Sequence, residues 1–148
     1  MKKLIISACL LGEFCRYDAK SKPCEQVGKL KKDYELIAIC PECMGGLPTP
    51  RPPAEVQKDG RVINREGRDV TAYYRAGAEA VLQIAKEQNC SLALLKEKSP
   101  ACGKGKIYDG SFTKTLKNGN GVCAELLLQN GVSVFGESEI ERLLEKMN

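Results

Sequence analysis

The sequence predicts a three-layer α/β domain, in which a mainly parallel sheet of about four strands carries helices on both faces in a Rossmann-like or flavodoxin-like layout. Three observations lead to this fold class. Short apolar runs recur along the chain, helical patterns separate them, and the runs are continuously apolar rather than alternating. Continuous apolar runs are typical of parallel strands, which are buried on both faces of their sheet.

Four apolar runs are the expected strands, and they span residues 3–8, 36–39, 92–95 and 132–135. Each run is short, as expected for a buried strand. Between the second and third runs, residues 56–63 contain the pair Asp59-Gly60. An Asp-Gly pair favours the tight turn of a β-hairpin, so we expect a hairpin appended to the sheet.

Helical periodicity separates the expected strands. The longest apolar stripe runs across 70–84 with i, i+3, i+4 spacing, and Asp69 is its expected N-cap. A shorter stripe across 122–127 stops at Asn130-Gly131, a pair that commonly ends a helix. These two segments supply the crossovers that a parallel sheet requires.

Two further helices are expected nearer the ends of the chain. The last apolar stripe covers 140–147, and Ser138 with Glu141 forms the expected capping box in front of it. A weaker pattern allows another helix across 24–32.

Length and composition indicate one domain that spans residues 1–148. Hydrophobic residues make up 43% of the chain and charged residues 28%, which is ordinary for a globular domain with its own core. The net charge is +4, from 23 basic and 19 acidic residues that are scattered along the sequence. This mild excess suits an anionic or RNA-linked substrate, but it does not predict an extended nucleic-acid interface.

The first nine residues, two lysines followed by a short apolar run, superficially imitate a signal peptide. The run breaks at Gly12-Glu13, so it is too short for a signal sequence and far too short to span a membrane. We therefore expect a cytoplasmic protein without a membrane partner.

Eight cysteines and no histidine are the unusual feature of the composition. In a reducing compartment, surplus cysteine more often indicates metal, cluster or thiol chemistry than disulfides. The lack of histidine excludes mixed Cys/His zinc sites, a Cys-His nucleophile pair and an imidazole base.

Three cysteines follow expected strands: Cys9, Cys40 and Cys102. Ligands of open α/β sheets bind beyond the carboxyl ends of the strands, and in a parallel sheet those ends share one edge. The three thiols can therefore converge, and such a donor set favours a soft metal or an iron–sulfur cluster. A [4Fe-4S] cluster held by three cysteines leaves one iron open to substrate.

The other five cysteines carry weaker expectations. Packing or incidental roles are the simplest interpretation of Cys24, Cys90 and Cys123. Cys15 is a candidate additional ligand, as a labile fourth one, or a sulfur acceptor. Cys43 forms a Cys-x-x-Cys pair with Cys40, which fits a redox pair, half a zinc site or an accident of sequence.

Substrate contacts are expected on the loops that carry these cysteines. The proline-rich stretch 48–53 stiffens the backbone around Arg51, which would suit an anchor for an anion or a carbonyl. Glycines allow backbone to approach a ligand closely. Tyr108 and Asp109 are individually more typical of turns. The expected substrate contacts are Arg16, Tyr17, Asp18, Gly45, Gly46 and Arg51.

An ordered set of short motifs occupies nearly the whole chain, at residues 7–12, 15–18, 40–42, 45–55, 67–71, 99–103 and 108–110. In this order the motifs resemble the thiouracil desulfidase family, long catalogued as a domain of unknown function. The resemblance implies a [4Fe-4S] cluster on Cys9, Cys40 and Cys102, whose fourth iron binds a thiocarbonyl sulfur. It also implies that Glu42 is the catalytic acid/base and Ser99 its helper.

Some features depart from the family's usual pattern. The resemblance implies a longer, two-domain desulfidase, of which this chain would be a single-domain short form. The usual serine between proline and cysteine is Ala101 here, and the usual glycine after Tyr17-Asp18 is Ala19.

The sequence therefore predicts an enzyme that uses a [4Fe-4S] cluster, without redox change, to hydrolyse the carbon–sulfur bond of a small thioamide or a thiolated nucleobase such as thiouracil. Glu42 lies two residues from Cys40, so its carboxylate can take a proton from attacking water. Three alternatives remain open at this point. They are a zinc module on Cys9, Cys15, Cys40 and Cys43, a thiol redox protein using Cys40 and Cys43, and action on sulfur-modified RNA.

Overall fold

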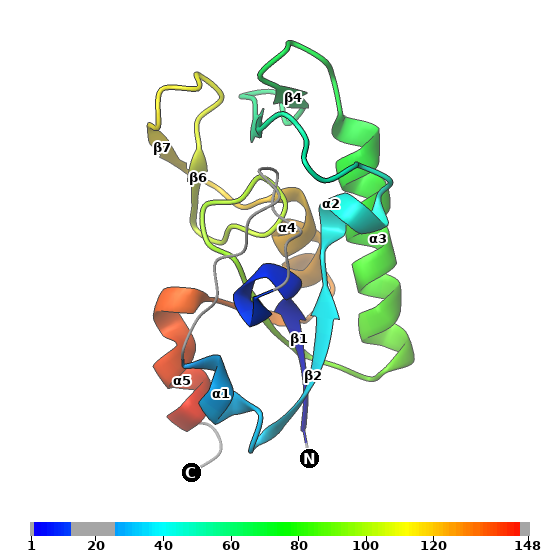
Figure 1. Ribbon diagram of the computed structural model, residues 1–148, viewed down its shortest axis with the longest axis vertical. Helices are drawn as coiled ribbons and strands as arrows, with labels where there is room; N and C mark the ends of the chain where they lie inside the picture. The colour runs from blue at the N-terminus through cyan, green and yellow to red at the C-terminus, as the bar shows by residue number, and fades with distance from the viewer. Residues whose placement is uncertain (1, 13–25, 146–148) are drawn as a thin grey trace.

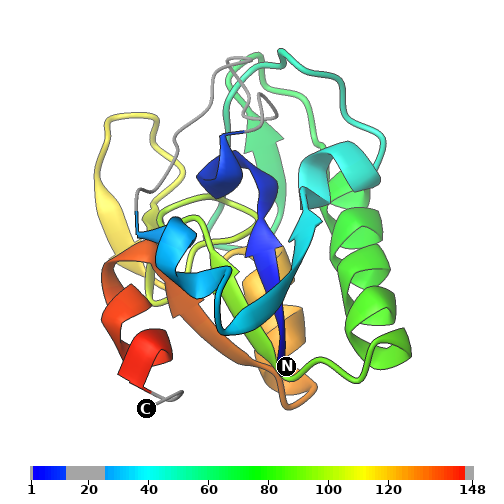
Figure 2. The ribbon, with the colours of Figure 1, turned by 60° about the horizontal axis from the view of Figure 1, so that its bottom comes forward.

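The computed structural model describes residues 2–12 and 26–145. A parallel sheet forms its centre, with strands β1 (Lys2–Ser7), β2 (Tyr34–Ile39), β5 (Leu92–Leu95) and β8 (Ser133–Gly136) in the order β2-β1-β5-β8. All three neighbouring pairs are parallel. The four expected strands and the α/β fold class are thus confirmed, and the carboxyl ends of the strands share one edge (Figure 2).

The sequence of β1 shows why this strand lies inside the sheet. Leu4, Ile5 and Ile6 are completely buried, because strands pair on both sides of β1 and helices cover both faces. Successive side chains of a strand point to opposite faces. Accordingly, Ile5 joins the core on one face, while Leu4 and Ile6 join the core on the other.

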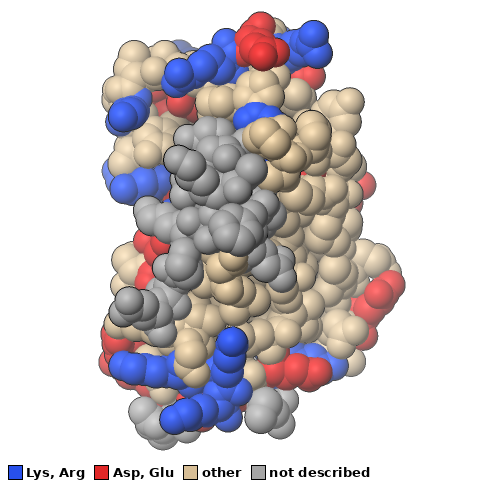
Figure 3. Space-filling model, viewed as in Figure 1, with Lys and Arg blue, Asp and Glu red and all other residues tan. Residues whose placement is uncertain are grey.

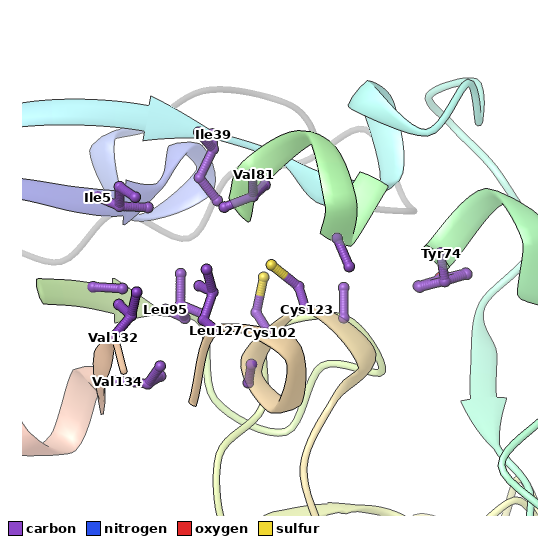
Figure 4. Packing of buried hydrophobic residues seen from close by; sticks show 14 of the residues in the cluster. Ile5, Ile39, Tyr74, Val81, Leu95, Cys102, Cys123, Leu127, Val132 and Val134 are labelled. Carbon is purple, nitrogen blue, oxygen red and sulfur yellow. The ribbon is translucent and has the colours of Figure 1, made fainter. Parts of the chain in front are cut away.

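Two long helices cover one face of the sheet. These are α3 (Thr71–Glu87) and α4 (Val122–Gln129), which also pack against each other (Figure 1). Their apolar side chains, including Val81 and Leu127, meet the sheet in the larger core cluster (Figure 4). None of the helices within the described ranges is long and apolar enough to cross a membrane.

Shorter elements cover the other face. They are the 3₁₀ turn η1 (Ala8–Leu11), the single turn α1 (Val27–Leu30) and α5 (Ile140–Glu145), which follows the 3₁₀ turn η2 (Glu137–Glu139). Tyr34 is buried beneath them, and its hydroxyl donates a 2.8 Å hydrogen bond to the carbonyl of Leu143. Helices therefore lie on both faces, as a three-layer fold requires.

Two hairpins and a short helix surround the carboxyl edge of the sheet (Figure 1). The expected hairpin around Asp59-Gly60 is confirmed as the antiparallel pair β3 (Ala54–Val56) and β4 (Val62–Asn64). A second hairpin, β6 (Lys106–Tyr108) and β7 (Leu116–Asn118), was not predicted. Nor was α2 (Pro41–Met44), which is too short to show helical periodicity.

Local side-chain competition changes two expected caps. The N-cap of α3 is Val70 rather than Asp69, although the Asp69 carboxylate still accepts a hydrogen bond from the Thr71 amide at 2.9 Å. The expected Ser138–Glu141 capping box is wrong, because the Ser138 hydroxyl donates to Glu97 instead. The Gly136 amide donates to Glu139 at this corner, at 3.1 Å.

Helices α2 and α3 touch through backbone rather than side chains. A Cβ at Gly77 would lie against the carbonyl of Pro41, and a Cβ at Gly45 would lie against the carbonyl of Tyr73, both nearer than atoms can approach. Each helix therefore presents a glycine to the other. This contact fixes how α2, with Cys40 at its N-cap, sits on the rest of the fold.

Because nothing flexible can yield at the Pro41 carbonyl, we expect Gly77→Ala to lower the free energy of unfolding by about 1–3 kcal/mol. Urea unfolding followed by circular dichroism measures this change. Gly28→Ala in α1 is the matched control, because no atom of the described residues outside its own helix lies within 4 Å of its added Cβ. Equal stability of the two variants would contradict direct backbone contact between α2 and α3.

Candidate functional site

A cavity opens at the carboxyl edge of the sheet. It has a volume of about 460 Å³, within the range of small-molecule sites. The loops after β2, β1 and β5, which are neighbouring strands, supply much of its wall. This is the place where open α/β sheets bind their ligands.

Three thiols line this cavity, namely Cys9, Cys40 and Cys102. Cys9 lies in η1 and is 7% exposed, Cys102 lies in the loop after β5 and is 4% exposed, and Cys40 is half-buried at the start of α2. Residues far apart in the sequence thus lie around one cavity.

The loop that carries Cys102 is joined to the start of α4 by main-chain hydrogen bonds. The amides of Val122 and Cys123 donate to the carbonyls of Pro100 and Ala101 at 2.8 and 2.9 Å. The first amides of a helix lack partners within the helix, so the loop acts as the cap of α4. Cys102 is consequently held by a rigid frame.

Ser99 shapes the same loop from inside. Its Oγ accepts hydrogen bonds from the amides of Ala101 and Cys102, both at 3.1 Å. A hydroxyl has two lone pairs and one proton, so these bonds use its accepting capacity and leave the proton to be donated. Ser99 lines the cavity, where that proton can reach a ligand.

Glu42 enters the cavity from α2. Pro41 occupies the first turn of the helix, where a missing amide costs nothing, and this starts the helix directly after Cys40. The Glu42 side chain is 13% exposed and lies 3.7 Å from the guanidinium of Arg51. Burial raises the pKa of Glu42, while the charge of Arg51 opposes that rise. The Cys40 thiol donates a long 3.9 Å contact to the same carboxylate.

Arg51 is fixed by the proline-rich loop around it. Its side chain is 4% exposed, and its Nη1 donates to the Pro48 carbonyl and to Thr49 Oγ1, both at 3.1 Å. The expected fixed position of Arg51 is therefore present, and the guanidinium faces Glu42. Thr49 Oγ1 also lies 3.4 Å from the Cys43 sulfur.

Tyr74 on α3 is a cavity residue that sequence patterns attributed only to a helix core. It is almost fully buried, and burial followed by the nearby charge of Glu42 strongly raises the pKa of its hydroxyl. The phenol is therefore a neutral hydroxyl at the base of the site. In the sequence, Tyr74 is one of the apolar residues with i, i+4 spacing along α3, and this pattern indicates a core residue rather than a cavity residue.

Burial also governs the thiols beneath the cavity. It raises the pKa of Cys102 well above the ordinary value, and the Glu42 carboxylate adds to the rise. The Cys123 sulfur lies beside it in the core (Figure 4), and burial raises the pKa of Cys123 to about 12. Cys123 does not line the cavity. Its packing role agrees with the expectation from its apolar helix face.

The two hairpins form a wall of the cavity that the sequence did not reveal. Glu55 on β3 is only 9% exposed, and its Oε1 accepts hydrogen bonds from the amides of Gly110 and Phe112 at 2.9 and 3.1 Å. Glu55, Arg65 and Phe112 all line the cavity. These contacts join segments far apart in sequence, so no local pattern could have indicated them.

An acid–base network forms another wall. Lys96 pairs with Glu137 at 2.9 Å, and the Glu97 amide donates to the same carboxylate at 2.8 Å. Glu97 in turn accepts a hydrogen bond from the Ser138 amide at 3.0 Å. Glu137 of η2 thus binds the loop after β5, and Glu97 of that loop binds η2 in return. These reciprocal hydrogen bonds hold the two segments together.

Several expected site residues lie elsewhere. Gly45 and Gly46 do not line the cavity, and Gly45 serves the contact between α2 and α3 instead. Cys43 is exposed outside the cavity, whereas Tyr108 lines it and Asp109 does not. The buried Cys90 thiol donates to the carbonyls of Lys3 and Leu92, at 3.4 and 3.3 Å. Outside the described residues lie Cys15, Arg16, Tyr17, Asp18 and Cys24.

Charge is unevenly distributed over the face in Figure 3. Lysine and arginine gather at the end that carries the hairpins and again at the opposite end, while the area over α2 and α3 is mostly uncharged. Within residues 2–12 and 26–145, no three Cys, Asp or Glu side chains are grouped closely enough to hold a single metal ion.

The fold and the cavity define a parallel-sheet α/β protein with a thiol-lined site at its strand ends. The chain belongs to the 2-thiouracil desulfurase family, whose model matches residues 4–139. It is 39% identical over 150 residues to the uncharacterized protein YbbK of Bacillus subtilis (strain 168), a match that covers 95% of this chain and 99% of that one.

A solved structure shares the fold in detail. It is described as the [4Fe-4S]-dependent thiouracil desulfidase TudS, and it matches with a TM-score of 0.92 and 43% sequence identity. The match covers 99% of this chain and 97% of the solved chain.

If Glu55 holds the β6–β7 loop, Glu55→Ala will leave two amides without their acceptor and lower the free energy of unfolding by about 1–3 kcal/mol. Hydrogen exchange of the Gly110 and Phe112 amides should accelerate. The Gly60 amide, which donates to the Gln57 carbonyl, is the internal control. Glu55→Gln keeps one oxygen acceptor and should preserve most of the protection. Unchanged exchange in Glu55→Ala would contradict this role.

Proposed function

We propose that this protein removes sulfur from a small thiocarbonyl compound of the thiouracil type, with a [4Fe-4S] cluster held by Cys9, Cys40 and Cys102. The observation that carries the proposal is the meeting of these three thiols in one cavity beside the carboxylate of Glu42. The [4Fe-4S]-dependent thiouracil desulfidase with the same fold supports both the reaction and the cofactor.

The chemistry of the donor set fits a cluster. Iron–sulfur clusters are held by cysteine thiolates, and the three thiols here come from three separate loops that surround one space. Each of the three segments is held in place by the rest of the fold. The turn η1 follows directly from β1, α2 packs on the backbone of α3, and the Cys102 loop caps α4. Three protein ligands leave one of four irons without one.

When bound, such a cluster supplies a soft Lewis acid that attracts the thiocarbonyl sulfur and stabilises the departing sulfide. The net reaction consumes one water, whose oxygen replaces the sulfur on carbon, and releases hydrogen sulfide. No electron is gained or lost. The remaining demand is to remove a proton from the attacking water and to place protons on the leaving sulfur.

Glu42 is the group that takes the proton from water. Its carboxylate points into the cavity and is held by Arg51 at 3.7 Å, so that its orientation is fixed before substrate arrives. A carboxylate in a largely buried site works as a general base and then, once protonated, as a general acid. Arg51 acts here as the positioning residue for Glu42.

Ser99 supplies a hydrogen-bond donor to the cavity. Because both accepting sites of its Oγ are occupied by the loop, its hydroxyl proton remains for donation to a substrate heteroatom or a water. This arrangement suits the orientation of a thioamide, which carries nitrogen beside the reacting carbon. Glu42 and Ser99 thus have complementary roles.

The thiol redox alternative is less well supported. Burial raises the pKa of Cys43, whereas a nucleophilic redox thiol requires a lowered one.

A zinc site on Cys9, Cys15, Cys40 and Cys43 would leave out Cys102, which lines the cavity, and include Cys43, which does not. We place the reaction in the cytoplasm, whose reducing conditions keep cysteine ligands as thiols.

Cys102→Ala should abolish cluster binding, whereas Cys43→Ala should retain it. The measurement is iron content and visible absorption after anaerobic reconstitution, with sulfide release from thiouracil as a second readout. Urea unfolding shows that each variant is folded. A thiol redox protein would instead lose its activity in Cys43→Ala and keep it in Cys102→Ala.

Glu42→Gln preserves the size of the side chain but removes the base, so we expect sulfide release to fall about 10²–10⁴-fold. Iron content should stay at the wild-type level, because Glu42 is not proposed as a ligand. Glu79→Gln, on the exposed side of α3, is the matched control. Full activity of Glu42→Gln would remove Glu42 from the mechanism.

A further inference from the structure

We infer that Phe112 is the stacking surface by which this site selects planar heterocyclic thiocarbonyls over open-chain ones. The inference rests on the proposed function and adds a residue that determines specificity. Phe112 belongs to the loop between β6 and β7, and its half-buried side chain lines the same cavity as the three thiols.

Phe112 and two other residues of the cavity wall have a positive φ angle, which residues other than glycine rarely adopt. The described residues other than glycine with positive φ are Asn89, Lys98, Phe112 and Lys114, and all except Asn89 line the cavity. For Phe112 the angle is +58°. Such conformations are unfavourable for residues with bulky side chains and persist where surrounding contacts fix them, commonly at ligand sites.

The contacts that fix Phe112 are present on its backbone and on its loop. The Phe112 amide donates to the buried carboxylate of Glu55 at 3.1 Å. Within the loop, the Ser111 amide and hydroxyl both donate to Asp109, and Ser111 also bonds with Thr113. The loop is therefore ordered before a ligand arrives, so little entropy is lost when the ring makes a contact.

The ring itself is supported on one side. The guanidinium carbon of Arg65 lies 5.6 Å from the ring centroid, within the range of a cation–π interaction. The Arg65 amide donates to the Pro53 carbonyl at 2.8 Å, which ties this support to the loop before β3. A ring covered by a cation on one side can offer its other face to a flat ligand.

Two other aromatic residues line the cavity within the described part of the chain, and both are less suited to this contact. Tyr74 is almost fully buried at the base, beside Glu42. Tyr108 carries a polar hydroxyl, whereas Phe112 presents only an apolar face. A conjugated thiolated ring gains from stacking on such a face, while a small open-chain thioamide gains little.

The test compares Phe112→Ala with wild type, both loaded with cluster, on thiouracil and on thioacetamide. Stacking holds substrate and transition state alike, so KM for thiouracil should rise roughly tenfold while kcat changes little. The parameters for thioacetamide should stay unchanged. Phe112→Trp, which keeps an aromatic face, should restore the KM for thiouracil. Tyr73→Ala, an exposed aromatic on α3, is the matched control.

Binding of uracil, which has no sulfur to remove, gives a readout that does not depend on turnover. Calorimetry should show uracil binding roughly tenfold weaker in Phe112→Ala and preserved in Phe112→Trp. Equal loss of kcat on both substrates with unchanged KM, or equal uracil affinity in wild type and Phe112→Ala, would overturn the stacking role. Failure of wild type to release sulfide from either compound would instead overturn the proposed function, and uracil binding would still decide the role of Phe112.

Discussion

The parallel pairing of β2, β1 and β5 is the constraint on which the site depends. Because these strands are neighbours and run in the same direction, the residues that follow them are delivered to one edge. Cys40, Cys9 and Cys102 follow the three strands in that spatial order. Their separation along the chain is large, yet the sheet brings all three to the wall of one cavity.

The contacts that organise the site are made mostly by backbone atoms, and in one place by the buried side chain of Glu55. Helix α2 is placed by glycine contacts with α3, the Cys102 loop by amides of α4, and the β6–β7 loop by the Glu55 carboxylate. Each device holds one segment of the cavity wall at a defined position. A site assembled in this way is ordered in advance, which is the condition for efficient general acid–base chemistry.

The sequence predicted the sheet and the thiols because both follow local rules. Apolar runs mark strands, and residues after parallel strands converge. It did not predict Tyr74, Arg65 or Phe112 as cavity residues, since docking of α3 and the hairpins decides their positions. Gly45 was expected at the ligand because glycine permits close approach. That reasoning was physically sound, but the partner that approaches is α3.

The link between the Cys102 loop and α4 bears on how the family can vary. All of its bonds are made by main-chain atoms, and the side chain of residue 101 makes none of them. Replacement of the family's usual serine by Ala101 therefore leaves the frame intact. Only volume is restricted, because Ala101 is fully enclosed. A larger side chain at residue 101 would clash with its enclosed surroundings and displace the neighbouring Cys102.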